Sequence, residues 1–210
     1  DWLKLVGIDA RVFLTTEHGM RGKSDQYGLY GPFAPIRSAA FSPEEGGSTR
    51  KLSNGDHYIV LSKQVLDNDT QWPETLAHEM THLVFNRFLP VRLPLWLNEG
   101  LAEYYGEFAY RAAKGMGQSK SNAFRPLRAR TPLAELLDAT AYPADPADVA
   151  RFYATSKYFV GYLLLKQPRA RWDAFFAKLL AGAPALPALL ETYGWADVAA
   201  AEKAFATFAR

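Results

Sequence analysis

The chain contains no cysteine, carries little net charge and has no apolar run long enough to cross a membrane. Without cysteine it cannot form disulfides or bind zinc through thiolates. Its 24 Lys and Arg residues nearly balance 22 Asp and Glu residues, so a net charge of +2 does not indicate nucleic-acid binding. The longest apolar run, near Tyr158 to Leu165, is too short to span a bilayer, and we expect no transmembrane segment.

His78, Glu79 and His82 form the motif H-E-x-x-H. Each residue of a helix advances by about 100°, so the two histidines lie about 40° apart and one turn from each other, close enough to share a tetrahedral cation. Glu79 lies off that axis, where its carboxylate can take a proton from a water held by the metal. Alternatively, both histidines are ordinary polar residues on a solvated helix face, because short motifs also match by chance.

Prolines and apolar periodicity define the helix that carries this motif. Pro73 suits the first turn and Pro90 suits the end, which predicts a helix over residues 72–88. The arc opposite the histidines is apolar and should be buried; it comprises Leu76, Met80, Leu83, Val84 and Phe88.

A second helical stretch follows Pro94 and carries Glu99 and Glu103 one turn apart. Burying a carboxylate without a partner is costly, and a metal with its histidine ligands supplies a partner. A catalytic zinc site takes three protein ligands and keeps one position for water, so we assign Glu99 as the third ligand. We expect Glu103 to accept a hydrogen bond from the other ring N–H of a histidine, which we take to be His78. The alternative is that Glu103 faces solvent.

The two motifs together resemble those of the gluzincin, or MA-like, zinc metallopeptidases. In that family H-E-x-x-H is followed by a helix carrying N-E-x-x-[SA]-[DE], which here reads Asn98 to Glu103. The resemblance implies one zinc ion held by a ligand set of His78, His82 and Glu99, with Glu79 as the general base.

A looser similarity to the small bacterial "peptidase MA-like" domains covers residues 56–210 through the segments 152–158, 193–198 and 205–208. Two features depart from the larger relatives. Sixteen residues separate His82 from Glu99, a shorter link than in the larger gluzincins. The sequence also lacks the G-x-M-E-N motif with which aminopeptidase relatives recognise a free N-terminus, and this absence favours internal cleavage.

Strand patterns precede helix patterns along the chain, which predicts an α+β fold. Runs at 11–16 and 57–62, and a weaker one at 38–42, read as strands, whereas 19–31 and 43–56 read as turn-rich connectors. We predict a strand-rich N-terminal part, residues 1–70, with a small mixed β-sheet. A mainly helical, zincin-like, zinc-binding part follows over residues 71–210, with the active-site cleft between them. The helices are expected at 72–88, 95–113, 132–137, 149–166, 169–180, 186–192 and 197–209.

Peptide hydrolysis also needs a donor that stabilises the oxyanion. In related enzymes a tyrosine or histidine from a later helix or loop serves, and Tyr153 occupies a fitting place, with Tyr158 second. Aromatic residues at helical spacing are often core residues, so Tyr153 could instead belong to the core.

The strand before the zinc helix is a sheet edge in the resembling enzymes, and substrate pairs with it. The corresponding residues here, Tyr58, Ile59 and Val60, are therefore expected to bind substrate main chain as an added strand. The alternative is a plain structural strand.

We therefore predict a zinc metallopeptidase, an endopeptidase that hydrolyses internal bonds of a peptide or protein substrate through a metal-activated water and Glu79. The expected cofactor is one zinc ion per chain. A zinc-bearing domain that recognises peptides or proteins without cutting them is the alternative, and a structural zinc is disfavoured because such sites usually have four ligands. The resemblance suggests an exported bacterial protein, periplasmic or secreted. The first residues, from Asp1, show no basic-then-apolar leader, which indicates either a cytosolic protein or a mature or trimmed form, and we favour the second.

Overall fold

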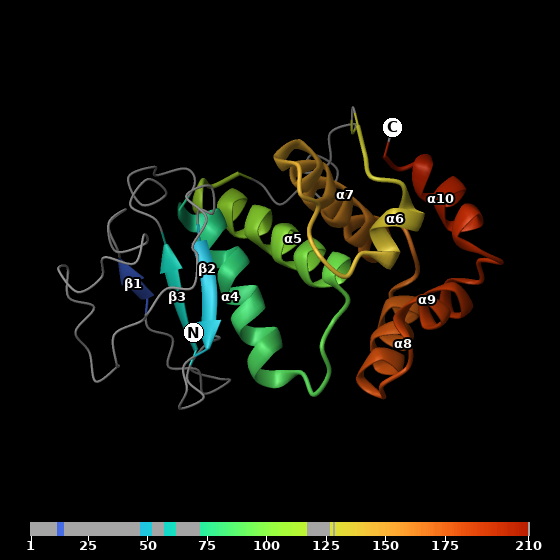
Figure 1. The fold of residues 1–210 in the computed structure, drawn as a ribbon, viewed down its shortest axis with the longest axis horizontal. Helices are drawn as coiled ribbons and strands as arrows, with labels where there is room; N and C mark the ends of the chain where they lie inside the picture. The colour runs from blue at the N-terminus through green and yellow to red at the C-terminus, as the bar shows by residue number, and fades with distance from the viewer. Residues whose placement is uncertain are drawn as a thin grey trace. The chain divides into compact units, whose positions relative to one another are not determined.

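The computed structural model describes residues 12–14, 47–51, 57–61, 72–116, 127 and 129–209. The chain divides into two compact units, Asp1–Arg87 and Phe88–Arg210. Figure 1 labels the strands β1 to β3 and helix α4, which belong to the first unit, and helices α5 to α10, which belong to the second. The boundary between the units falls before Phe88, the last residue of α4, whereas the boundary predicted after residue 70 precedes this helix.

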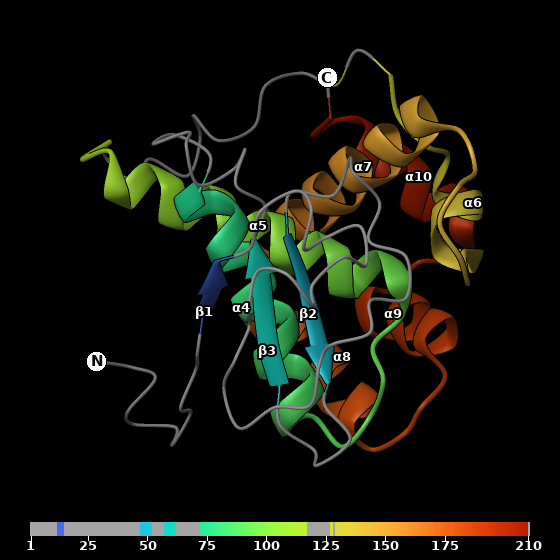
Figure 2. The same cartoon turned by 60° about the vertical axis from the view of Figure 1, so that its left-hand side comes forward.

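Three short strands pair within the first unit: β1 (Val12–Leu14), β2 (Gly47–Lys51) and β3 (His57–Leu61). The strand order is β1-β3-β2, with β3 parallel to β1 and antiparallel to β2, so β3 is the middle strand (Figure 2). β1 and β3 lie within the runs 11–16 and 57–62, whereas β2 lies in a stretch that we predicted as a connector. The predicted strand at 38–42 and the connector at 19–31 lie outside the described residues.

Helix α4 spans Trp72–Phe88, which confirms the helix predicted from the prolines and periodicity. Pro73 occupies the first turn, where a helix does not need the N–H that proline lacks. On the apolar arc, Leu83 is buried against Ile59 of β3, and Leu76 and Met80 pack beside them. Phe88 is 47% exposed, so the predicted buried face is wrong at the last residue of the helix.

The second unit is built from the helices α5 (Leu95–Ala113), α6 (Leu133–Asp138), α7 (Pro146–Leu165), α8 (Arg169–Leu180), α9 (Ala185–Tyr193) and α10 (Val198–Ala206). Each lies within three residues of its predicted bounds, which confirms this part of the prediction. The start of α7 differs because Asp145 accepts bonds from the N–H groups of Ala147 and Asp148, with Pro146 in the first helical position. No helix in the described ranges is long and apolar enough to cross a membrane.

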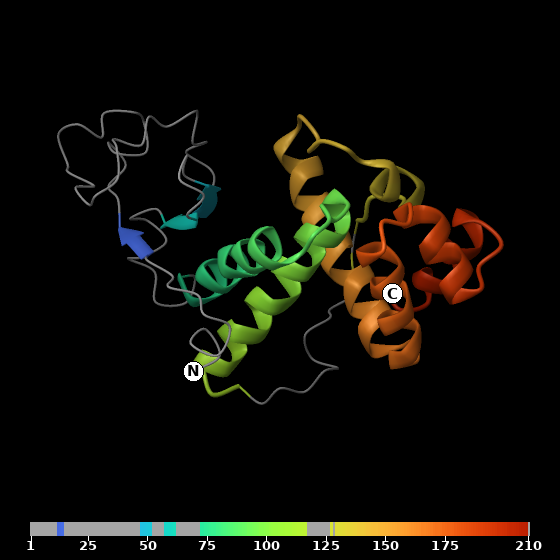
Figure 3. The same ribbon diagram turned by 90° about the horizontal axis from the view of Figure 1, so that it is seen from below.

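Helices α5 and α7 pack closely, as the views in Figures 1 and 3 agree. Gly100 makes this approach possible. A Cβ at Gly100 would lie 2.6 Å from the carbonyl oxygen of Ser156 and 2.6 Å from Cγ2 of Val160. Both distances are shorter than real Cβ contacts, so a side chain at this position would force the two helices apart.

Aromatic side chains fill the interior of the second unit. Trp96 of α5, Phe159 of α7 and Phe205 of α10 are almost fully buried. Their ring centroids lie 5.3 Å apart between Trp96 and Phe159 and 5.2 Å apart between Phe159 and Phe205. Such contacts are favourable beyond the area that they bury. The core therefore fixes α5, the helix that carries Glu99, against α7.

The predicted α+β fold with an N-terminal mixed β-sheet is wrong, because the part of the chain that defines the fold is mostly helical, at 71%, and contains no strand; β1, β2 and β3 lie outside it. The described strands are only three, five and five residues long. The side chain of Ile59 in β3 is buried, against Leu83 of α4. Runs with β propensity build a sheet only where a face is buried, and here the helices bury the core. The cleft predicted between a sheet and the helices loses its basis as well.

Candidate metal centre

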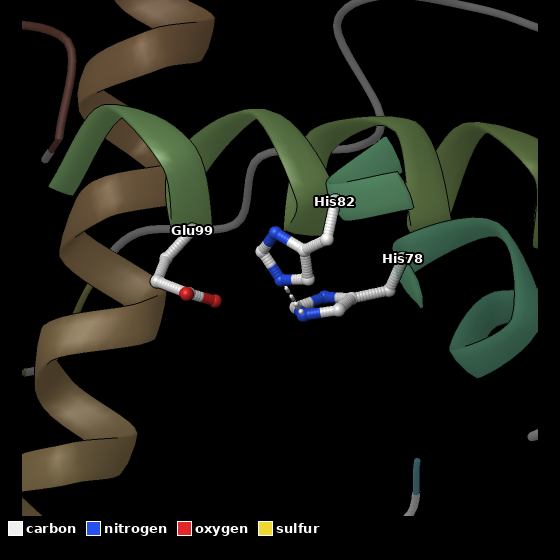
Figure 4. A group of neighbouring side chains, drawn as sticks. All are labelled: His78, His82 and Glu99. Atoms are coloured by element: carbon white, nitrogen blue, oxygen red, sulfur yellow. Dashed lines mark hydrogen bonds between the residues drawn. The ribbon is translucent and has the colours of Figure 1, made fainter. Parts of the chain in front are cut away.

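Helix α4 brings the imidazoles of His78 and His82 together. Their Nε2 atoms lie 3.0 Å apart, and their ring centroids lie 4.7 Å apart with an interplanar angle of 79°. Figure 4 shows the two rings meeting through these nitrogen atoms. Two nitrogen ligands about 2.05 Å from one tetrahedral zinc would stand about 3.3 Å apart. The pair therefore needs little adjustment to bind one ion.

Helix α5 presents Glu99 from its second turn. The helix begins after Pro94, whose carbonyl oxygen accepts a bond from the N–H of Asn98 at 2.9 Å. Glu99 is only 2% exposed, and its Oε1 accepts a hydrogen bond of 2.6 Å from the hydroxyl of Tyr142. A carboxylate buried to this degree requires polar or charged partners. The phenol supplies one, and a cation would supply a stronger one.

His78, His82 and Glu99 each offer one ligand atom, and these atoms lie within 4.8 Å of one another. Figure 4 shows the carboxylate of Glu99 turned toward the ring of His82. Two imidazoles and one carboxylate are a donor set that suits catalytic zinc, which binds three protein ligands and keeps one position open. The three residues could therefore hold a metal ion, and the chemistry of their donor atoms fits zinc.

Each of the two helices carries one further acidic residue near its ligands, Glu79 on α4 and Glu103 on α5. Glu79 follows His78 on α4 and is 6% exposed. Because consecutive helix residues point about 100° apart, Glu79 does not share the direction of the histidines. Glu103 lies one turn after Glu99 on α5 and is half-buried. The role of Glu79 as a base and the hydrogen bond from His78 to Glu103 stay predictions.

The two tyrosines considered as oxyanion donors occupy different surroundings on α7. The ring of Tyr153 stacks on that of Tyr142, with centroids 5.8 Å apart and an interplanar angle of 25°. Tyr153 is thus connected to Glu99 through Tyr142, and its role as an oxyanion donor stays a prediction. Tyr158 is 7% exposed and lies in the core, where its ring is 6.5 Å from that of Phe208.

Tyr142 contacts the ligand residue Glu99, and nothing in the sequence pointed to this contact. Tyr142 lies between α6 and α7, 43 residues after Glu99, and has no spacing relation to either motif. The following Pro143 signals an extended segment or turn, not a metal site. Burial, followed by the charge and hydrogen bond of Glu99 and the contact with Tyr153, raises the pKa of Tyr142 well above its ordinary value. The phenol therefore keeps its proton, and its O–H group donates a hydrogen bond to the carboxylate of Glu99.

The prediction that Tyr58, Ile59 and Val60 form a substrate-binding edge is wrong for this sheet. β3 is hydrogen-bonded to β1 on one side and to β2 on the other, so its main chain is not open to an added strand. The error arose because β2 has the sequence Gly-Ser-Thr-Arg-Lys. This polar segment lacks the alternation of apolar residues that reveals a strand.

Comparison with known proteins adds no identification: no family model, no curated protein and no solved structure matches this chain. The geometry of the ligand residues and the two motifs are therefore the observations that bear on function.

Proposed function

We propose that the chain is a zinc-dependent metallopeptidase that hydrolyses internal bonds of a peptide or protein substrate. The observation that carries the proposal is that the ligand atoms of His78, His82 and Glu99 lie within 4.8 Å of one another. The resemblance of both motifs to those of the gluzincins supports the same ligand set, with one zinc ion per chain. The absence of a G-x-M-E-N motif from the sequence supports internal cleavage over removal of N-terminal residues.

In this proposal, bound zinc supplies Lewis acidity, which makes a water acidic enough to act near neutral pH and polarises the scissile carbonyl. Glu79 accepts the proton of the attacking water at its carboxylate and passes it to the leaving amine. A tyrosine hydroxyl, proposed to be that of Tyr153, donates a hydrogen bond to the oxyanion. Glu79 is 6% exposed, so the proposed proton transfer would take place out of contact with bulk water.

Three substitutions on α4 separate metal binding from proton transfer. Glu79→Gln keeps the side-chain size and removes the proton acceptor, so zinc content should match that of the wild type while cleavage of a mixed peptide library falls by about 100-fold or more. His82→Ala should lose both zinc and cleavage. Glu74→Gln makes the same chemical change in the first turn of α4, outside the ligand group, and should retain both.

Cleavage by the wild type that disappears with a chelator and returns with added zinc would support the proposal. Undiminished cleavage by the Glu79→Gln variant would reject the base, and equal zinc content in the wild type and His82→Ala would reject the ligand. One zinc per chain with no cleavage of any library peptide would favour a zinc-bearing domain that recognises peptides or proteins without cutting them.

A further inference from the structure

The hydroxyl of Tyr142 contacts the carboxylate of Glu99 directly, at 2.6 Å. We propose that Tyr142 is a positioning residue, which holds Glu99 through Oε1 and so makes this carboxylate bind the metal through a single oxygen. This inference rests on the proposed function only in taking Glu99 as a metal ligand. It concerns how the ligand is held and not what the metal does to a substrate.

The ring of Tyr142 is held on two sides by the first turns of α7. It stacks on Tyr153 at 5.8 Å and meets Phe152 edge to face, with centroids 6.3 Å apart and an interplanar angle of 85°. Phe152 is 1% exposed and therefore fixed in the core. Asp145, which caps α7, lies three residues after Tyr142 and fixes the start of the helix. Tyr142 itself is 48% exposed, so these two ring contacts and the hydrogen bond to Glu99, and not burial, hold the phenol in place.

Oε1 of Glu99 is the atom that this fixed hydroxyl contacts. A hydrogen bond to a charged oxygen is short and strong, and it competes with metal binding at that atom. Glu99 itself is fixed because α5 packs closely on α7 at the next residue, Gly100. The carboxylate is thus restrained by its helix and by its hydrogen bond, which favours coordination through one oxygen. Two histidines and one oxygen then leave a tetrahedral ion with a free position.

Without the hydrogen bond from Tyr142 to Oε1, the carboxylate of Glu99 could bind the metal through both oxygens and take up an additional coordination position. Hydrogen-bond partners of metal ligands typically contribute about 10- to 100-fold to metal affinity or activity. Loss of the Tyr142 hydroxyl should therefore change both the affinity and the coordination of the metal, whether or not the protein cleaves peptides.

The test uses the full chain with Tyr142→Phe, which removes the hydroxyl and keeps the ring in its stack. Zinc affinity is measured by competition with a chromogenic chelator, and coordination is measured from the visible spectrum of the cobalt(II)-loaded protein. Tyr162→Phe is the matched control, because the Tyr162 hydroxyl also has a hydrogen-bond partner, Gln167 at 2.7 Å, and does not contact Glu99. Tyr142→Phe should bind zinc about 10-fold more weakly or worse, with weaker cobalt absorption as four-coordinate geometry gives way to five-coordinate.

Zinc affinity within twofold of the control, together with an unchanged cobalt spectrum, would overturn the inference even if Tyr142→Phe were less stable, since Tyr142 would then be only structural. A wild-type chain that binds no zinc would overturn both this inference and the proposed function. Zinc binding without peptide cleavage would contradict the proposed function alone, and the effect of Tyr142→Phe on affinity and spectrum would still decide the inference.

Discussion

Gly100→Ala tests the close approach of α5 and α7, on which the position of Glu99 depends. The new Cβ would lie 2.6 Å from a backbone oxygen of Ser156, an atom that cannot turn aside, and 2.6 Å from Cγ2 of Val160. Overpacking of this kind costs about 1–3 kcal/mol, and a rigid backbone contact justifies the upper value of about 3. Alanine is the better helix former by about 1 kcal/mol. The net loss should be about 2 kcal/mol.

For a protein of 150 to 250 residues, about 2–4 °C per kcal/mol converts this loss into a fall of about 4–8 °C in the Tm. Thermal and urea denaturation, followed by circular dichroism in the presence of a chelator, measure it without a metal contribution. Zinc affinity should fall too, because Glu99 precedes Gly100. Stability equal to or above that of the wild type would refute the packing argument. Ser156→Ala is the control at the same contact, since the buried Ser156 Oγ has no hydrogen-bond partner in the described part of the chain and its removal should cost little.

Four further outcomes follow from the same structure. Glu99→Gln should keep an acceptor for Tyr142 but lose at least about 10-fold in zinc affinity, measured by chelator competition, because it removes a charged ligand. Removing zinc from the wild type should lower the Tm, since free zinc at 100 times its Kd stabilises the folded state by about 2.7 kcal/mol. Asp145→Ala should cost about 1 kcal/mol in urea denaturation through loss of the α7 cap. Glu202→Ala should cost about 1–3 kcal/mol, because Oε2 accepts from Leu133 N–H at 2.7 Å and Oε1 pairs with Arg130, and Glu202→Gln should recover part of that loss.

The helices and the ligand group were predictable because their signals are local. Pro73 and Pro94 mark the first turns of α4 and α5, and apolar periodicity defines the extent of both helices. The spacing of His78 and His82 sets their geometry on one helix without help from the rest of the fold. Predicting Glu99 required one additional step, namely that a carboxylate in an apolar segment needs a partner.

Other features depend on contacts that no local pattern encodes. The polar sequence of β2 conceals a strand, whose pairing makes β3 internal and removes the predicted edge. The β-branched runs that suggested an α+β fold express a propensity that depends strongly on context. Tyr142 approaches Glu99 only because the connection between α6 and α7 and the stacking on Tyr153 place it there. A residue in a connecting segment, far from either motif, cannot be singled out among eleven tyrosines by spacing.

The most direct test of the central claim is X-ray absorption at the zinc edge of the zinc-loaded full chain, compared with His82→Ala and Glu99→Ala. The account predicts one zinc per wild-type chain, with two imidazole nitrogens and one carboxylate oxygen from the protein at about 2.0–2.2 Å. Each substitution should remove its own ligand from the spectrum or abolish binding. A wild-type spectrum without two imidazoles, or one that neither substitution changes, would contradict the account.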